Sequence, residues 1–356
     1  MTSLFDPLSL PSGAMLKNRF VLAPLTNTQS RADGVLSEEE LHWLTMRAQG
    51  GFALTMTCAA SVQESGQGFP GQLGFHDDAH LPGLTRLAGA IKRESSLAIA
   101  QLHHGGVRSL KTPKGPSADE KFKAEAMTLD EVVQARDSFI SAALRAERAG
   151  FDGVELHGAH GYLICTFLSA ESNRREDVYG GDAERRARFL FEIVDGIRAA
   201  TKPGFTLGVR LSPERWGLAL GEIRDVAQRL MREARVDFLD ISLWDYRKEP
   251  EEEAFKGRSL ASYFTELTRG GVRLGGAGKI MSAEDARAVL AAGFDFPLIG
   301  RAAILHHDFP KRVAADANFA ARATPVSEAY LHQEGLSPAF VQYMRNWKDF
   351  VEPAAA

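Results

Sequence analysis

Short apolar runs alternate with longer amphipathic segments from about residue 20 to about residue 313. This alternation is typical of repeated βα units, in which parallel strands form a sheet that the helices cover. Eight runs have the composition of buried strands, and they lie at residues 20–23, 52–57, 97–102, 153–157, 206–210, 238–242, 273–275 and 296–299. Eight strands match a TIM barrel, whereas a doubly wound sheet of about six strands leaves two without a place. The pattern therefore predicts an α/β fold, a single (β/α)8 TIM barrel.

The helices between these strands are marked at their starts and along one face. Three pairs of residues fit a capping box, in which a hydroxyl and a carboxylate bind free N–H groups: Ser37 with Glu40, Thr128 with Glu131, and Ser282 with Asp285. Apolar residues at helical spacing are expected to pack on the sheet: Phe189, Ile193 and Ile197, and then Ile223, Val226 and Leu230.

The chain is expected to form one domain over residues 1–356, with the barrel at about 18–315 and a C-terminal tail at about 316–356. The turn residues 11–13 predict an N-terminal hairpin that closes one mouth of the barrel. Residues 107–127 combine Lys with Pro and Gly, and they fall between the third strand and the third helix. A loop there is expected to lie over the active face.

Charge and composition narrow the class of protein. The 356 residues include 42 Lys and Arg against 46 Asp and Glu, a net charge of −4, which argues against a nucleic-acid partner. No run approaches the ~20 apolar residues that cross a bilayer, and the N-terminus lacks the pattern of a secretory signal. We therefore expect no membrane association and a cytoplasmic location. Cys58 and Cys165 are too few for a disulfide framework or a structural zinc site, so redox chemistry would depend on a bound cofactor.

Glycine-rich turns follow the last two predicted strands. In TIM barrels, active sites lie at the carboxyl ends of the strands, and the turns after strands seven and eight often bind phosphate. Here these turns are residues 275–278 and Gly300 with Arg301. Glycines also serve as helix caps and turns, so the first turn alone is weak evidence. Together with the charge of Arg301, the two turns predict a phosphorylated ligand.

The end of the fourth strand carries the most specific chemistry. His157, His160 and Tyr162 crowd one short turn, where two imidazoles could hold an oxyanion while a phenol delivers a proton. The histidines could instead be structural, or they could bind a metal together with Glu155. A metal site would need further ligands from other strand ends, and the end of strand one offers only Leu25 and Thr26. We therefore expect no metal.

The segment from Glu155 to Phe189 resembles the old yellow enzyme family, the FMN-dependent ene-reductases also called NADH:flavin oxidoreductases. The resemblance extends from residues 16–20 to Arg301. It implies a TIM barrel with one tightly, non-covalently bound FMN and with NADPH or NADH as the hydride donor. It also implies ping-pong reduction of alkenes conjugated to a carbonyl or nitro group, with hydride from flavin N5.

The resemblance assigns roles to particular residues. It implies that the flavin and its phosphate contact Ala23, Pro24, Leu25, Thr26, Ala59, Gln101, His157, Arg210, Gly278, Lys279, Gly300 and Arg301. Arg210 would stabilise negative charge on the reduced flavin, although it could alternatively form a buried salt bridge. His157 and His160 would bind the oxygen of the substrate, and Tyr162 would donate the proton.

Some residues depart from the family pattern. Ala170 and Arg185 replace the residues usual in relatives, and both look structural. The 107–127 loop differs more, which leaves the substrate open. The tail at residues 342–347 resembles a segment that some members insert into a neighbouring subunit. In a homo-oligomer Arg345 would then reach a second active site, whereas a merely packed tail is the alternative.

The predicted function is an FMN-dependent ene-reductase acting on a small alkene and a nicotinamide nucleotide. Two alternatives belong to other classes: a metal-dependent TIM-barrel hydrolase and a flavin-binding protein without catalysis. Yellow colour would exclude the hydrolase, and turnover would exclude the non-catalytic protein.

Overall fold

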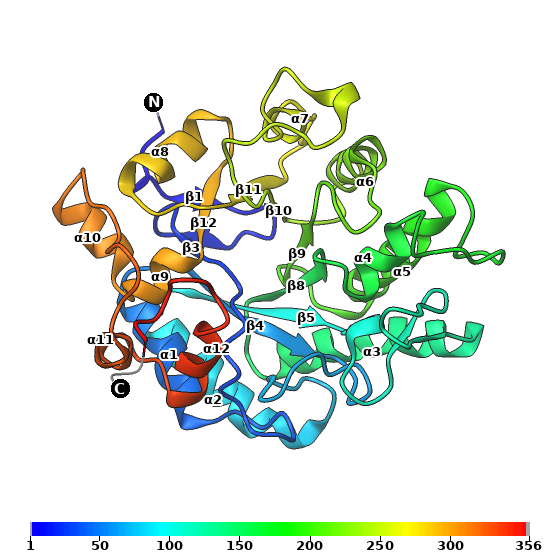
Figure 1. Cartoon of the computed structure of the whole chain (residues 1–356), viewed down its shortest axis with the longest axis horizontal. Coiled ribbons are helices and arrows are strands. Elements are labelled where there is room, and N and C mark those ends of the chain that lie inside the picture. Colours follow the sequence, from blue (N-terminus) through cyan, green and yellow to red (C-terminus); the bar gives the residue numbers. More distant parts are fainter. Residues whose placement is uncertain (1, 354–356) are drawn as a thin grey trace.

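The computed structural model describes residues 2–353 and contains a closed eight-stranded parallel barrel ringed by helices (Figure 1). In spatial order its strands are β10 (Phe238–Ser242), β11 (Arg273–Ala277), β12 (Phe296–Ile299), β3 (Val21–Leu22), β4 (Leu54–Ser61), β5 (Leu97–His103), β8 (Gly153–Gly158) and β9 (Thr206–Leu211). All eight predicted strands are present, so the predicted TIM barrel is confirmed. The first strand is shorter than predicted, and the second extends further toward its carboxyl end.

Side chains alternate between the inside and the outside of the barrel, as the period of a strand requires. Parallel register places Gln101 beside Glu155, and Arg210 beside both His157 and Asp240. The residues between them along the strands are apolar and fully buried against the helices, as Leu156 is. Polar side chains from four neighbouring strands therefore share the barrel interior.

Twelve α-helices lie within residues 2–353. They are α1 (Glu38–Gln49), α2 (Leu81–Arg93), α3 (Leu129–Arg148), α4 (Leu163–Leu168), α5 (Ala183–Ala200), α6 (Leu220–Arg232), α7 (Ser262–Thr265), α8 (Ala283–Ala291), α9 (Arg301–Leu305), α10 (Phe309–Ala315), α11 (Glu328–Gln333) and α12 (Pro338–Met344). Short 3₁₀ turns lie at Asp78–His80, Gly106–Arg108 and Glu253–Phe255. The apolar residues predicted to face the sheet in α5 and α6 are all buried. None of these helices is long and apolar enough to cross a membrane.

Two of the three predicted capping boxes form in full, at the starts of α3 and α8. The third prediction is only half correct. Ser37 caps α1 by accepting from the Glu40 N–H, but the Glu40 carboxylate does not return to the cap. Glu40 is fully buried and accepts hydrogen bonds from Asn27 and Ser30 instead. It anchors the segment that follows β3, because a buried carboxylate needs donors on its oxygens.

The predicted N-terminal hairpin forms from β1 (Leu8–Ser9) and β2 (Met15–Leu16), which pair antiparallel. Leu8, Leu10 and Leu16 belong to the same buried cluster as inward-facing strand residues such as Phe238 and Phe296. The hairpin therefore closes the amino-terminal mouth of the barrel, and this apolar plug fills the lower interior. The upper interior, where the polar side chains lie, is left for the site.

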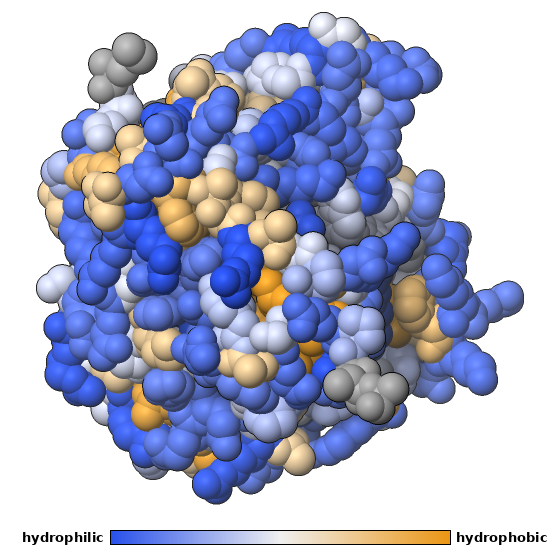
Figure 2. Space-filling view, turned by 60° about the vertical axis from the view of Figure 1, so that its left-hand side comes forward, coloured by the Kyte–Doolittle hydropathy of each residue, from blue (hydrophilic) through white to orange (hydrophobic). Residues whose placement is uncertain are grey.

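The segment predicted as an irregular loop lies between β5 and α3. It contains the small pair β6 (Lys114–Gly115) and β7 (Glu125–Ala126). The C-terminal tail folds back on the barrel as α11 and α12 (Figure 1). The face in Figure 2 is largely hydrophilic, with smaller hydrophobic areas between the charged residues, as in most folded proteins.

Candidate active site

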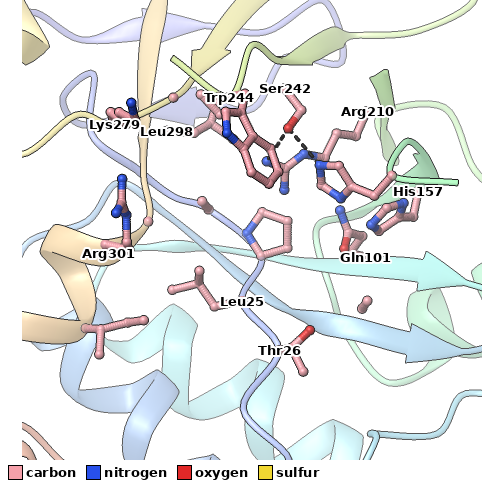
Figure 3. Close-up of a pocket in the computed structure, with 18 of the residues that line it drawn as sticks. Leu25, Thr26, Gln101, His157, Arg210, Ser242, Trp244, Lys279, Leu298 and Arg301 are labelled. Atoms are coloured by element: carbon pink, nitrogen blue, oxygen red, sulfur yellow. Dashed lines mark hydrogen bonds between the residues drawn. The ribbon is translucent and has the colours of Figure 1, made fainter. Parts of the chain in front are cut away.

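A pocket of about 630 Å³ opens at the carboxyl ends of the barrel strands, and its volume is within the usual range for small-molecule sites. It gathers fourteen of the predicted site residues: Ala23, Pro24, Leu25, Thr26, Ala59, Gln101, His157, His160, Tyr162, Arg210, Gly278, Lys279, Gly300 and Arg301. Figure 3 shows Lys279 and Arg301 gathered at one end and Gln101, His157 and Arg210 at the other. The sequence-predicted residues therefore share one cavity.

The second of these ends, which we call the buried end, contains a network of polar and charged side chains inside the barrel: Gln101, Glu155, Arg210 and Asp240. The Gln101 amide donates to Glu155 Oε1 at 2.7 Å, and Arg210 Nε lies 3.0 Å from Asp240 Oδ2. Both carboxylates are fully buried. Burial and the charge of Asp240 raise the pKa of Glu155 well above its usual range. Burial raises the pKa of Asp240 to about 6 despite the opposing charge of Arg210.

This network contains two carboxylates but only one cation. One proton within it restores neutrality, and we expect Glu155 to hold that proton, because Asp240 faces the Arg210 cation whereas Glu155 faces the neutral Gln101 amide. Asp240 is then the anion opposite Arg210. Glu155 Oε2 is buried without a hydrogen-bond partner in residues 2–353, but Glu155 does not line the pocket. The Gln101 amide and the Arg210 guanidinium do line the pocket, so these are the groups of the network that a ligand there can contact.

His157 and His160 lie side by side, with ring centroids 5.1 Å apart. Burial lowers the pKa of both imidazoles well below the usual range, and nearby positive charge adds to the effect. Both rings are therefore neutral near pH 7. His157 Nδ1 accepts from the Ala159 N–H at 3.4 Å, so its proton is on Nε2. His160 Nε2 lies 2.8 Å from the Ser242 hydroxyl (Figure 3).

Tyr162 stands directly before α4, and its ring packs on the edges of two histidines. The centroid of its ring lies 5.1 Å from that of His157 and 4.3 Å from that of His103. The Arg108 guanidinium lies 5.2 Å from the same ring. No residue in the described chain takes the Tyr162 hydroxyl in a hydrogen bond. A phenol is therefore available next to the imidazole pair, as general acid chemistry requires.

Several residues that line the pocket hold strained backbone conformations. His160, Trp216, Trp244 and Lys279 all have positive φ, between 50° and 67°. This region is unfavourable for residues with a side chain and costs of order 1 kcal/mol or more at each position. Such strain is concentrated at functional sites, where the surrounding structure maintains it. Here all four residues face the same cavity.

The opposite end, which we call the open end, is built from the turns after β11 and β12. A Cβ at Gly278 would lie only 2.9 Å from the backbone nitrogen of Asp245, so only glycine lets these loops approach. Lys279 Nζ lies 3.0 Å from the Asp245 carboxylate. Arg301 begins α9, is exposed, and has no carboxylate within 4 Å in residues 2–353. Two cations and free backbone N–H groups at these two turns are suited to binding a phosphate.

The structure also adds residues that sequence reasoning missed. Asp240 could have been found from strand periodicity, because it lies two residues before Ser242 and faces the same side. Arg108, Trp216 and Trp244 lie on loops that lack a periodic signal. The tail contributes Tyr343, Met344 and Trp347 to the pocket of its own chain. Burial raises the pKa of Tyr343.

Arg345 does not line this pocket. Its guanidinium donates to Glu328 at 3.1 Å and to the Glu352 carbonyl at 3.0 Å, both in the same chain. This arrangement agrees with the alternative that the sequence left open, a tail that is merely packed on its own chain. The contact of Arg345 with a second subunit stays a prediction.

The sequence profile of the NADH:flavin oxidoreductase / NADH oxidase family matches residues 3–319. The chain belongs to this family. It is 37% identical over 326 residues to the probable NADH-dependent flavin oxidoreductase YqiG of Bacillus subtilis, covering 87% of both chains. It is 34% identical over 331 residues to an NADPH dehydrogenase of Bacillus cytotoxicus, covering 89% of this chain and 94% of that one.

Solved structures agree with the sequence comparisons. The old yellow enzyme homologue of Zymomonas mobilis has a TM-score of 0.78 at 27% identity, covering 93% of this chain and 96% of that one. Against three longer relatives at 31% identity, the chain spans only 33–48% of their length. The chain is an NAD(P)H-dependent flavin oxidoreductase of the old yellow enzyme family, with FMN as its cofactor.

The residues of this flavin oxidoreductase fit FMN. The open end offers the charge and the glycine turn that a phosphate needs, and the buried end offers the Gln101 amide and the Arg210 guanidinium for a heterocycle. Between them lie the small residues Ala23, Pro24 and Ala59. A metal site finds no comparable support, because residues 2–353 contain no cluster of three or more His, Cys, Asp or Glu arranged for a metal.

Proposed function

We propose that this flavin oxidoreductase reduces alkenes conjugated to a carbonyl or nitro group, with NADH or NADPH as the hydride donor. The observation that carries the proposal is the set formed by His157, His160 and Tyr162. The ring of His157 lies 5.1 Å from that of His160 and 5.1 Å from that of Tyr162, so two neutral imidazoles and a free phenol share the wall of the same pocket. When bound, FMN supplies the hydride transfer in both half-reactions.

The residues of the chain then share the remaining chemistry. The Nε2–H of His157 donates a hydrogen bond to the carbonyl or nitro oxygen, and His160 binds the same oxygen from the other side. Their hydrogen bonds strengthen as negative charge moves onto that oxygen, which lowers the barrier. Tyr162 gives its hydroxyl proton to the alkene carbon next to the activating group, and water returns a proton to the phenolate. Neutral imidazoles suit this role, because they bind a carbonyl without competing as acids.

The remaining pocket residues hold the cofactor in this proposal. Arg210 faces the pyrimidine side, where negative charge accumulates on reduction, and Gln101 and Thr26 hydrogen-bond the ring edge. Ala23, Pro24, Leu25 and Ala59 lie along the ring. Gly278, Lys279, Gly300 and Arg301 bind the phosphate, as their charge and backbone geometry support.

Anaerobic stopped-flow absorbance tests the proposal by separating the two halves of the cycle. The yellow holoenzyme should lose its visible band with NADH or NADPH and regain it with 2-cyclohexenone, a maleimide or a nitroalkene. A protein that is bleached by nucleotide but recovers with none of these alkenes is not an ene-reductase. A protein that binds FMN but is bleached by neither nucleotide is the non-catalytic alternative.

Tyr162→Phe is the sharpest variant, because it keeps the ring and removes the acidic proton. Bleaching by nucleotide should stay within a few-fold of wild type, since that half needs no proton for carbon. Recovery with 2-cyclohexenone should slow by ~10²–10⁴, the usual contribution of a positioned general acid. Nitroalkenes should be affected least, because their stabilised anion can be protonated by water. Wild-type recovery with 2-cyclohexenone would assign the proton to another donor.

A further inference from the structure

The charges that line the pocket are all positive. Its walls include Arg108, Arg210, Lys279 and Arg301, whereas no Asp or Glu side chain lines it. Two of these cations have carboxylates behind the wall, because Arg210 faces Asp240 and Lys279 faces Asp245. Arg301 lies at the open end, where the phosphate of FMN fits. Of the four cations, Arg108 is therefore the one that has neither a carboxylate behind the wall nor the FMN phosphate as a counter-ion.

Arg108 begins the loop that sequence analysis expected over the active face. Two other cations of this loop have partners outside the pocket: Lys111 binds Glu64, and Lys114 binds Glu131. The Arg108 guanidinium has no carboxylate within 4 Å and no hydrogen-bond acceptor in residues 2–353. It is only half-buried, so its charge is available to a ligand in the pocket.

The position of Arg108 is fixed by its neighbours. Its guanidinium lies 5.2 Å from the centroid of the Tyr162 ring and 5.6 Å from that of Phe122, both within cation–π distance. A Cβ at Gly161, where φ is +73°, would lie 3.1 Å from Arg108 Nη2 and 2.6 Å from the Trp216 ring. Because Gly161 has no side chain, Arg108 and Trp216 can pack against the turn that carries His160 and Tyr162.

We propose that Arg108 determines substrate specificity by binding a carboxylate on the alkene, so that the enzyme prefers conjugated alkenes with a second, anionic group. This inference rests on the proposed ene-reduction. The ring of Tyr162 separates Arg108 from His157 by two steps of about 5 Å, a span that one small molecule covers. An ester or ketone oxygen at the histidines and a carboxylate at Arg108 would hold the alkene between them, beside the proton donor.

A phosphate of the nicotinamide nucleotide is the other anion that could use this cation. The geometry favours the substrate, because a ribose separates the phosphates from the nicotinamide ring that must lie at the reacting centre. Arg108 is packed directly on Tyr162, next to that centre. The experiment below distinguishes the two sources.

Monomethyl fumarate and dimethyl fumarate are matched probes, since they differ by one methyl group and one negative charge. In Arg108→Met holoenzyme, kcat/KM for the monoester should fall about tenfold to a hundredfold, the usual effect of losing a charge-assisted hydrogen bond. The diester should stay within about threefold. Lys111→Met, on the same loop and outside the pocket, should change neither. Arg108→Lys should recover part of the preference, because it restores the charge without the planar fork.

Three outcomes would overturn the assignment. An equal fall for both esters would mean that Arg108 supports Tyr162 or the pocket shape. Slower bleaching by NADH or NADPH in Arg108→Met, with both esters unaffected, would assign the cation to the nucleotide. A monoester rate unchanged in Arg108→Met would remove the carboxylate contact altogether. Each variant should retain FMN and the wild-type unfolding temperature, which excludes a folding defect.

A binding measurement keeps this inference separate from the proposed function. Oxidised holoenzyme can be titrated with 4-hydroxybenzoate and with its methyl ester, following the change in flavin absorbance. Arg108→Met should weaken the acid by about tenfold to a hundredfold and leave the ester unchanged. Equal binding of the acid by both proteins contradicts the inference. If wild type recovers with no alkene at all, ene-reduction fails, while this titration still decides whether Arg108 binds a carboxylate.

Discussion

Two ion pairs stand behind opposite ends of the same pocket. Arg210 Nε lies 3.0 Å from Asp240 at the buried end, and Lys279 Nζ lies 3.0 Å from Asp245 at the open end. The distances are equal, but the surroundings differ: the side chains of the first pair are 8% and 0% exposed, and those of the second 48% and 22%. Distance alone therefore says little about what each pair does.

Solvent access gives the two carboxylates opposite pKa shifts. Burial raises the pKa of Asp240 to about 6, because Arg210 only partly offsets the loss of water. Burial acts the same way on Asp245, but the Arg247 N–H and the Lys279 ammonium outweigh it and lower its pKa. At the buried end the Arg210–Asp240 pair stays charged although burial disfavours the ionised carboxylate. Arg210 is therefore a fixed cation at the place where the flavin ring would lie. At the open end water also stabilises the charges of the pair, and the cations can turn toward a ligand.

Replacing each cation should expose this difference most strongly in the stability of the fold. Arg210→Met leaves the Asp240 carboxylate buried without its counter-ion, and it should lower the free energy of unfolding by about 3–5 kcal/mol at pH 7.5. Lys279→Met, the matched control, breaks a solvated pair and should cost less than about 1 kcal/mol. Urea unfolding of FMN-free protein measures both. Similar losses for the two variants would show that burial does not separate the ends.

The open end should act mainly on the ligand. Arg301→Ala removes an exposed cation, and FMN affinity should fall by roughly tenfold to a hundredfold, as a charge-assisted hydrogen bond of ~1.5–3 kcal/mol predicts. Unfolding of the FMN-free protein should change by less than about 0.5 kcal/mol, as for most surface substitutions. Fluorescence titration with FMN measures the affinity. Unchanged affinity would place the phosphate elsewhere in the pocket.

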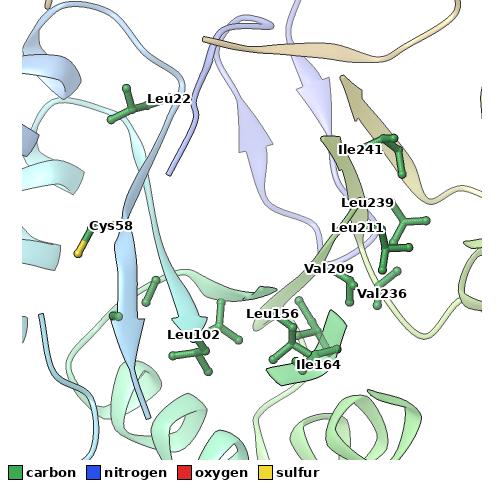
Figure 4. Close-up of a cluster of buried hydrophobic side chains, with 14 of the residues drawn as sticks. Leu22, Cys58, Leu102, Leu156, Ile164, Val209, Leu211, Val236, Leu239 and Ile241 are labelled. Carbon is green, nitrogen blue, oxygen red and sulfur yellow. The ribbon is translucent and has the colours of Figure 1, made fainter. Parts of the chain in front are cut away.

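Much of the fold was predictable from sequence because parallel strands that are buried on both faces appear as short continuous apolar runs. Leu102, Leu156, Val209 and Leu239 each lie in a predicted strand, and Figure 4 shows them in the buried apolar layer. The fourteen pocket residues were predictable because the strand ends and the family resemblance point to the same positions. What the sequence could not predict is how separate loops meet. Arg108, Trp216 and Tyr343 come from three distant segments, and only the closed barrel brings them to one mouth.

The sequence also left the state of Arg210 open between a flavin contact and a buried salt bridge. The structure contains the buried salt bridge, because Asp240 lies beside Arg210 Nε. It also leaves the flavin contact possible, because Arg210 lines the pocket. The capping box predicted at Ser37 forms only in part for a related reason. Glu40 has the right spacing for a capping box, but distant donors compete for its carboxylate.

The two ends should also differ in how stability depends on pH. Burial raises the pKa of Glu155 above its unfolded value, so the folded protein keeps a proton that the unfolded chain loses above about pH 4.5. Wild type therefore loses unfolding free energy as the pH rises through this window, by at most about 1.4 kcal/mol per pH unit. Glu155→Gln cannot ionise and still accepts from Gln101, so its stability should rise relative to wild type between pH 5 and 7.5.

Asp245→Asn is the matched control at the open end. Because the folded pKa of Asp245 is lowered, this carboxylate is ionised in both the folded and unfolded states between pH 5 and 7.5. Its contribution is lost only at lower pH, as the pH falls through the folded pKa. The variant should be less stable than wild type by under about 1 kcal/mol, and the two urea-unfolding curves should stay parallel across this range. If Glu155→Gln also stayed parallel to wild type, Glu155 would be ionised in the fold, and the buried end would hold two negative charges around Arg210.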